Sequence, residues 1–497
     1  MSTVAAASAH LPPALPTLAR QDFPSWLPAT LVKELRQGLR TRGFVGSFIG
    51  FQILMALLMT IVAASSWSRD GVITAGAFNT ANGFFWGILT LQLLVFTPAR
   101  ALGSLQLEVS SRTIDLLMLT RLDAWRIVMG KWASLVAQSA LLLVAVLPYG
   151  IVRYFVGSVD LVQDARRGLA IFGAGMLLTA AALWGAGMGK IFRFVIIGLV
   201  VFFFSAGSSA FSAFMRGGGP LAAMGGVKGA AIGMVWFDGL LFGAFFLIMA
   251  VRNIAPRAEN YAWLVRLLPL IALLPIPVGS AIVGVSLAIN AQLLVSGFFL
   301  ILVAAIELAN LELPLFVHFQ AARKRSALPR VLLRMTLPGW QSAYLYVIFA
   351  TVLWVACVLS ISAVSATGAP GLDLSRMIWT AVLAMAALTF PSLVLSFLPR
   401  APRGAAGVYI ATLVASAAMT PVGYALASTT PKLAFLKTAL GVFPGASFLA
   451  TLIDPSPPVS QVVFQAVFAV VVIVGAWWQT RGYWQYLTVL EARAERA

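Results

Sequence analysis

Apolar runs of about 17 to 25 residues, the length that a membrane-crossing helix requires, recur along this 497-residue chain. Such runs constrain the fold strongly, because in hydrocarbon every backbone polar group must find a partner and a helix pairs them within one segment. The composition agrees, since 60% of the residues are hydrophobic and 10% are charged. We therefore expect an all-α polytopic membrane protein.

Twelve spans can be placed, with both chain termini on the cytoplasmic side. This orientation puts most of the 34 Lys and Arg residues inside, whereas the reverse orientation would put most of them outside. Topology therefore accounts for the net charge of +18, and no basic run interleaved with aromatic residues points to nucleic acid. The predicted spans are Gly43–Ala64, Ala81–Pro98, Ala133–Ile151, Leu169–Met188, Val195–Phe211, Ala231–Val251, Leu267–Ile289, Leu293–Leu308, Ala343–Val364, Met377–Leu398, Val408–Leu426 and Val462–Trp478.

The segment Leu107–Trp132, between the second and third predicted spans, is rich in charges of both signs. One charge at the centre of a bilayer costs roughly 2.5–3.5 kcal/mol, so this segment cannot cross the membrane. Glu108 and Arg112 lie four residues apart and can be neighbours on a helix. The pattern predicts a short amphipathic helix that docks on a partner, with an ordinary solvated loop as the alternative. Its apolar stripe is formed by Ile114, Leu117 and Met118.

From Glu108 to Lys131 this segment resembles the loop after the second helix in permeases of ABC transporters of the type-2 exporter class. The pattern in that family runs roughly E-R-E-x-G-T-L-E-L-L-L-x-T-P-L-x-x-W-x-I-V-x-G-K. Clear departures from it are Val109, Ser110, Arg112 and Arg121. Positions that match or nearly match are Glu108, Thr113, Asp115, Leu116, Leu117, Thr120, Leu122, Trp125, Ile127, Val128, Gly130 and Lys131.

The resemblance implies that this loop is a cytoplasmic coupling helix that contacts a separate ATPase subunit. It also implies that ATP and magnesium bind to that subunit, and that this chain carries no cofactor and is not itself an enzyme. In the motif, Lys131 is expected to act as an interfacial anchor. The residues expected to take part in coupling are Glu108, Arg112, Thr113, Asp115, Leu117, Thr120, Trp125 and Lys131.

The same resemblance suggests two six-helix halves, because residues 212–230 and 427–461 both precede the last span of a half. In that family this place holds re-entrant half-helices. The expected organisation is a disordered tail at residues 1–25, a permease domain at 26–251 with its coupling loop at 99–132, and a second membrane domain at 252–497. The second domain carries a basic cytoplasmic loop at residues 311–341, but it lacks a counterpart of the coupling motif.

The segment Leu31–Arg42 has leucines on one face and basic residues on the other. It is predicted to be an amphipathic helix lying on the cytoplasmic leaflet, with an ordinary helix leading into the first span as the alternative. A similar element precedes the first span in the resembled family. Its interfacial basic residues are Lys33, Arg36 and Arg40.

Two carboxylates, Asp238 and Glu307, fall inside predicted spans and are candidates for a transport pathway. Asp238 lies toward the outer third of its span and Glu307 close to the inner end, so each could reach interfacial water. His10 and His318 are far apart and give no metal pattern, and Gly185–Lys190 does not match a phosphate-binding loop. We find no nucleotide-binding domain in the sequence.

The function that this pattern favours is the membrane-spanning permease subunit of an ATP-driven exporter in the cytoplasmic (inner) membrane. Its expected partners are an ABC ATPase subunit and the lipid bilayer, with a second permease copy left open. A secondary transporter that uses Asp238 or Glu307 for ion coupling is the main alternative, and a non-transporting membrane scaffold is another. A membrane-embedded enzyme ranks last, because it would need a cluster of catalytic side chains.

Overall fold

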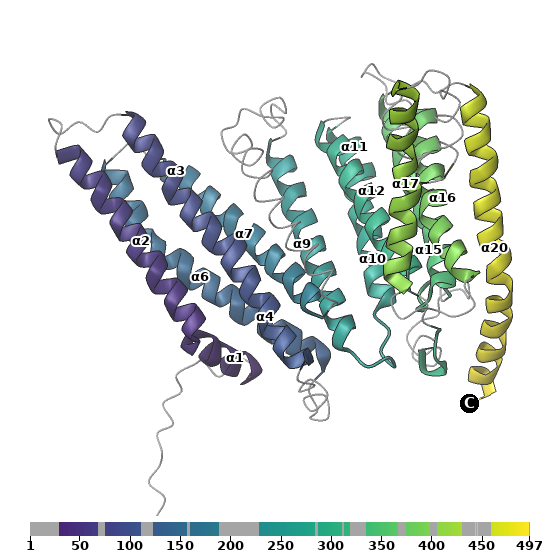
Figure 1. The fold of residues 1–497 in the computed structure, drawn as a ribbon, viewed down its shortest axis with the longest axis horizontal. Helices are drawn as coiled ribbons and strands as arrows, with labels where there is room; N and C mark the ends of the chain where they lie inside the picture. The colour runs from purple at the N-terminus through teal and green to yellow at the C-terminus, as the bar shows by residue number, and fades with distance from the viewer. Residues whose placement is uncertain are drawn as a thin grey trace, which may run out of the picture. The chain divides into compact units, whose positions relative to one another are not determined.

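The computed structural model describes most of the chain as helices (Figure 1). Its regular structure in the described part is entirely helical, as predicted. The described residues are 29–67, 75–110, 123–156, 160–187, 228–283, 287–310, 313–318, 334–365, 374–397, 405–429, 443, 445 and 459–496. The helices are α1 (Ala29–Arg40), α2 (Arg42–Trp67), α3 (Ala75–Leu91), the π-helical turn η1 (Gln92–Phe96), α4 (Thr97–Ser110), α6 (Ala124–Val156), α7 (Leu161–Ala186), α9 (Lys228–Ile254), α10 (Ala262–Leu273), α11 (Pro275–Val283), α12 (Leu287–Leu308), α15 (Trp340–Ser365), α16 (Leu374–Ser396), α17 (Ala405–Thr429) and α20 (Val459–Arg496).

Ten helical stretches among the described residues are long and apolar enough to cross a membrane. The protein is therefore a multi-pass membrane protein. The predicted fifth span, Val195–Phe211, lies outside the described residues, as does the predicted disordered tail at 1–25. The eleventh coincides with α17, whose apolar described stretch, Val408–Met419, is shorter than the other ten. The count of twelve, the orientation and the two six-helix halves stay predictions.

The predicted boundary between the seventh and eighth spans is wrong. The first of these spans is a broken helix, α10 followed by α11, whose membrane-length stretch is Ala262–Ile282. Pro275 and Pro277 lack the backbone N–H that would continue the α-helical ladder, and at the break Leu274 N–H donates to the Ile271 carbonyl over 3.1 Å. Ile289, which was expected to end this span, belongs to α12.

The last helix, α20, continues well beyond the predicted end at Trp478. Its 38 residues extend about 57 Å, against about 30 Å for the hydrocarbon core of a bilayer. The extra turns are held by an apolar cluster in which Tyr483, Leu487 and Leu490 pack with Leu337. Hydropathy alone misses these turns, because only one of their faces is apolar.

The chain divides into two compact units, which we describe separately. The first comprises residues 1–89 and 126–160, and the second comprises 90–125 and 161–497. Neither boundary falls at the predicted division between residues 251 and 252, which stays a prediction.

In the first unit, α6 makes polar contacts with each of the other helices. Tyr149 donates its hydroxyl to the Gln52 carbonyl of α2 over 3.3 Å. Arg153 donates to the Asn82 side chain of α3, and its guanidinium lies 4.1 Å from the centroid of the Phe85 ring. Lys131 pairs with Glu34 of α1. Helix α6 is therefore the element around which this unit is assembled.

In the second unit, α7 packs against both α4 and α9, and α12 packs against α10, α15 and α16. Helix α16 also contacts α17 and α20. Small residues allow the close approach of α7 to its neighbours, as is common between membrane helices. A Cβ atom added at Gly175 would lie 3.0 Å from the Leu93 carbonyl oxygen of η1, and one added at Gly173 would lie 2.6 Å from the Trp236 ring.

Replacing Gly175 with Val should lower the thermal stability of the purified protein. The added Cβ meets backbone, which cannot rotate away, and overpacking of this kind typically costs about 1–3 kcal/mol. Gly233→Val is the matched control, because a Cβ at Gly233 meets no described atom within 4 Å. The unfolding midpoint in detergent measures the effect, and an equal fall in both variants would contradict the packing of α7 on η1.

Candidate functional site

Most of the predicted coupling residues cannot be placed. Glu108 lies in the last turn of α4, but its side chain is outside the described set. Trp125 and Lys131 belong to the first turns of α6, so the connection between the two helices is shorter than the predicted segment. The coupling role of these residues stays a prediction. Those outside the described residues are Arg112, Thr113, Asp115, Leu117 and Thr120, together with Ile114 and Met118 of the apolar stripe.

Among the described residues of the motif, Lys131 forms an ion pair. Its side chain is only 5% exposed, and its Nζ lies 3.4 Å from both carboxylate oxygens of Glu34 in α1. Two turns further along α6, Gln138 also lies close to α1. A Cβ added at Gly38 would lie 2.2 Å from Nε2 of Gln138. Lys131 therefore ties α1 to the start of α6, a contact that the sequence analysis did not predict.

Helix α1 has the predicted amphipathic character. The leucines of one face, Leu31, Leu35 and Leu39, are half-buried, whereas Lys33, Arg36 and Arg40 are exposed. Helix α1 is separate from the first span, α2, because Thr41 lies between them outside either helix. Its hydroxyl donates to the Gly38 carbonyl over 2.7 Å and accepts the Phe44 N–H over 3.3 Å, which caps the beginning of α2.

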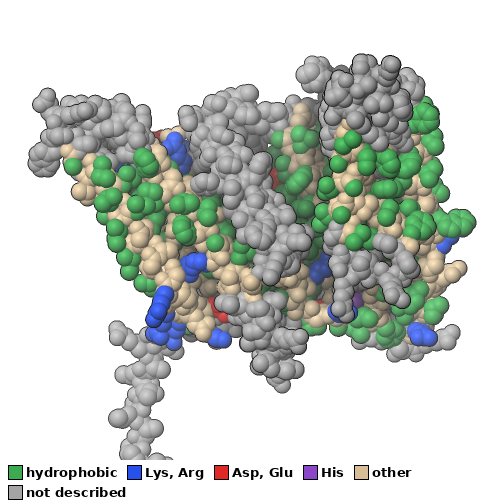
Figure 2. All heavy atoms as spheres, viewed as in Figure 1, with side chains coloured by type: hydrophobic (Ala, Val, Ile, Leu, Met, Phe, Trp, Pro, Cys, Tyr) green, Lys and Arg blue, Asp and Glu red, His purple; other side chains and the backbone are tan. Residues whose placement is uncertain are grey.

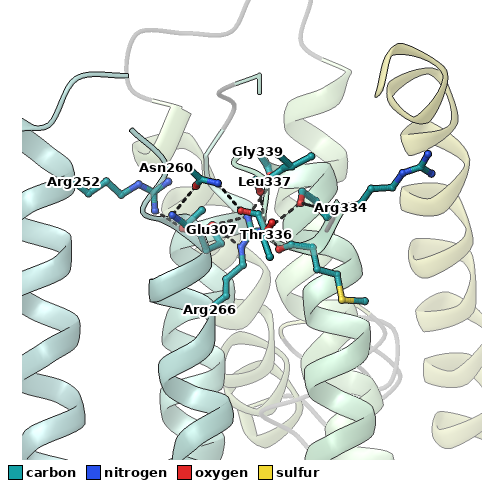
Figure 3. A network of polar contacts seen from close by, with 11 residues as sticks. Arg252, Asn260, Arg266, Glu307, Arg334, Thr336, Leu337 and Gly339 are labelled. Carbon is teal, nitrogen blue, oxygen red and sulfur yellow. Dashed lines mark hydrogen bonds and ion pairs between the residues drawn. The ribbon is translucent and has the colours of Figure 1, made fainter. Parts of the chain in front are cut away.

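The second unit contains an ion-pair cluster around a fully buried carboxylate, the Glu307 cluster, formed by Glu307, Arg252 and Arg266 (Figure 3). Glu307, near the end of α12, has 0% exposed surface. Arg252 of α9 donates to Oε1 of Glu307. Arg266 of α10 binds the other oxygen, with Nε at 2.9 Å and Nη2 at 2.6 Å from Oε2. Glu307 is thus enclosed by two arginines instead of open to interfacial water.

Arg266 also holds the turn that leads into α15. Its Nη1 donates to the carbonyls of Met335 over 2.6 Å and Leu337 over 2.9 Å, and to the Ser342 hydroxyl over 3.1 Å. The turn ends at Gly339, whose φ of 111° lies in the region that favours glycine, and whose carbonyl accepts the Ala343 N–H over 3.0 Å. The guanidinium therefore supplies donors that backbone carbonyls of this turn would otherwise lack.

A second ion pair extends this network to the end of the chain. Arg334 donates from Nε and Nη2 to the two carboxylate oxygens of Glu491 in α20, over 3.1 and 3.0 Å. Asn260 donates to the Thr336 carbonyl over 2.8 Å and accepts the Ala262 N–H, so it also caps α10. Polar contacts thus join α9, α10, α12, α15 and α20 at one end of the second unit.

The loop between α9 and α10 holds two further polar contacts. The ring of His318 accepts the Leu315 N–H at Nδ1 over 3.1 Å, which leaves Nε2 to donate to the Arg257 carbonyl at 2.9 Å. Tyr261 donates its hydroxyl to Glu259 over 2.6 Å. Burial, together with the nearby carboxylate of Glu259, raises the pKa of the Tyr261 hydroxyl, so this group keeps its proton throughout the physiological range.

Asp238, the other predicted pathway residue, lies half-buried on α9. Gln292 of α12 donates from Nε2 to Oδ1 of Asp238 over 2.8 Å and to the Ala272 carbonyl over 3.3 Å. Gln292 and Glu307 are separated by 15 residues of α12, which is about 22 Å along the helix. The structure therefore does not bring the two predicted carboxylates into one site.

Sequence reasoning missed the partners of these charged residues. Glu34, Arg252 and Arg266 were not selected as site residues, although each pairs with a buried charged side chain. One rule could have pointed to them: a charged residue within an apolar run needs a counter-charge nearby. No group of three or more metal-ligating side chains occurs among the described residues.

Comparisons with protein-family models, with curated proteins and with solved structures found no match to this chain.

Glu307→Gln should destabilise the second unit strongly. The change removes the buried carboxylate that both guanidinium groups bind, and breaking a buried ion pair from one side typically costs about 3–5 kcal/mol. Glu259→Gln is the control, since Glu259 is exposed on the loop before α10. We expect a lower unfolding midpoint for Glu307→Gln alone. A variant as stable as the wild type would contradict a structural role and return Glu307 to the candidates for ion coupling.

The Lys131–Glu34 pair can be tested with a double-mutant cycle of Lys131→Met, Glu34→Gln and the combined variant. Because the two side chains contact each other, their effects on the free energy of unfolding should be non-additive by about 0.5–3 kcal/mol. Lys33→Met, on the exposed face of the same helix, should be additive with Glu34→Gln. Additive effects of Lys131→Met and Glu34→Gln would rule out the contact between α1 and α6.

Proposed function

We propose that the chain is the membrane-spanning permease subunit of an ATP-driven exporter of the ABC type-2 class, working with a separate ATPase subunit in the cytoplasmic membrane. The observation that carries this proposal is the ungapped resemblance of Glu108–Lys131 to the coupling loop of that class. Ten membrane-length helices are consistent with such a subunit. The substrate class is left open, since no described residue identifies it.

The arrangement around the coupling segment supports a mechanical role. The segment connects α4, which ends at Ser110, to α6, which begins at Ala124 and runs for 33 residues. Helix α1 is fixed to the start of α6 by the Lys131–Glu34 pair. Packed helices move as units and do not deform gradually. A push from an ATPase on residues 111–123 would therefore displace α6 and α1 together.

The main alternative, a secondary transporter, needs a carboxylate that can release and rebind an ion or proton. Glu307 suits this role poorly, because exchange would require breaking its contacts with both Arg252 and Arg266. Asp238 is the better candidate, since it is half-buried and accepts a hydrogen bond from the neutral amide of Gln292. Transport driven by an ion gradient without an ATPase, and lost in Asp238→Asn, would favour this alternative.

The proposal is tested by purifying the tagged chain in mild detergent and identifying any ATPase subunit that comes with it. We expect an ATPase to co-purify with the wild type. In the double variant Glu108→Ala with Arg112→Ala, it should be lost or its activity should no longer respond to the permease.

Asp164→Ala with Arg167→Ala is the matched control. These residues form an acid–base pair three positions apart in α7, on the opposite side of the membrane in the predicted topology. The control should retain the ATPase and its activity. If no ATPase co-purifies with the wild type and none responds to the reconstituted chain, the proposal fails.

A further inference from the structure

The second membrane-length stretch passes from one compact unit to the other without a break in the helix. The chain crosses between the units at residues 89–90, 125–126 and 160–161. The last two crossings fall at the beginning of α6 and of α7. The first falls inside Asn82–Gln106, which consists of the end of α3, the π-helical turn η1 and most of α4. Two units therefore share one span.

The two halves of this span are held by different neighbours. In the first unit, Arg153 of α6 donates to the Asn82 side chain of α3, and its guanidinium lies 4.1 Å from the centroid of the Phe85 ring. In the second unit, η1 and α4 pack against α7. Any movement of one unit relative to the other must therefore bend or twist the span between Phe85 and α4.

The turn η1 lies at this place and has an irregular ladder of hydrogen bonds. The Gln92 carbonyl accepts the Thr97 N–H and also the Thr97 hydroxyl, the latter over 3.2 Å. A regular α-helix would give the Thr97 N–H to the Leu93 carbonyl, and it would give the N–H of residue 98 to the Leu94 carbonyl. Residue 98 is a proline and has no N–H, so the α-helical ladder is interrupted at two successive carbonyls. Turns of this kind are recognised sites of helix bending.

The turn rests on α7, yet its hydrogen bonds can change. Gly175 of α7 lets the Leu93 carbonyl come close, because a Cβ there would lie 3.0 Å from the carbonyl oxygen. If the Thr97 N–H moved from the Gln92 carbonyl to the Leu93 carbonyl, one hydrogen bond would replace another of the same kind. The Thr97 hydroxyl could still donate to a carbonyl of the preceding turn. The turn can therefore pass between π and α geometry at little cost in hydrogen bonds.

We propose that η1 is a hinge on which the first unit moves as a body relative to the second, about a pivot fixed to α7. Hinges are short segments that absorb changes in backbone angles while the packed elements on either side keep their shape. The first unit keeps its shape through the contacts of α6 with α1, α2 and α3. The hinge follows from the fold of this span and does not depend on the proposed export function.

The test measures distances between two spin labels in the full chain, in lipid nanodiscs, by pulsed electron paramagnetic resonance. Cys357, the single cysteine, is first replaced in Cys357→Ala. Hydrophobic side chains are widespread on the described surface (Figure 2), and exposed ones can carry labels without disturbing the packing. Leu147→Cys in α6 with Leu240→Cys in α9 compares the two units. Leu240→Cys with Val474→Cys in α20 reports on the second unit alone.

We expect a broader distribution of distances for the pair across the units than for the pair within one unit. Deleting Val95 removes the extra residue of the π turn, so it should narrow the first distribution toward the width of the second and leave the second unchanged. Pro98→Ala restores the missing N–H and should narrow the first distribution in part, which keeps the test valid if the deletion variant does not fold.

Two results would overturn the proposal. One is an equal width for the two pairs in the otherwise unchanged chain, because the units would then not move relative to each other. The other is a broad distribution across the units that neither the deletion nor Pro98→Ala narrows, because the motion would then not pass through η1.

Discussion

A carboxylate sealed in an apolar helix bundle must find its counter-charges within the protein, because no water is available to solvate it. Glu307 meets this requirement with two arginines from two other helices. The contacts extend to further helices. Arg266 also donates to carbonyls of the turn before α15, and Arg334, from the same turn, binds Glu491 of α20. The ends of five helices are thereby held in one arrangement. Removing Glu307 would leave the guanidinium of Arg266, which is 3% exposed, without its carboxylate.

The first unit uses the same principle on a smaller scale. Lys131 is buried in α6, and its counter-charge comes from α1, 97 residues earlier in the chain. The amphipathic helix α1 is therefore bound to α6, the helix that follows the coupling segment. If the chain is a permease, the segment that an ATPase would touch and the helix that would touch lipid are therefore mechanically joined through α6.

The sequence predicted the spanning helices well and their partners poorly. Hydropathy is a local property, so it located the apolar stretches of α2, α9, α15 and α16 closely. The break between α10 and α11 was foreseeable from Pro275 and Pro277, but an unbroken apolar run concealed it. The Glu307 cluster joins residues 55 and 41 positions apart, and no periodicity predicts which arginine will meet which acid. For the candidate coupling residues, the prediction still rests on a resemblance, because most of them lie outside the described part of the chain.

The length of α20 has a mechanical consequence. It is one continuous helix of 38 residues, packed along α16 and bound through Glu491 to Arg334. Because a helix without a proline resists bending, its two halves cannot shift independently. The helix works as a strut: a rearrangement at the Glu307 cluster would reach the far end of α16 as a rigid displacement, with no intermediate loop to absorb it.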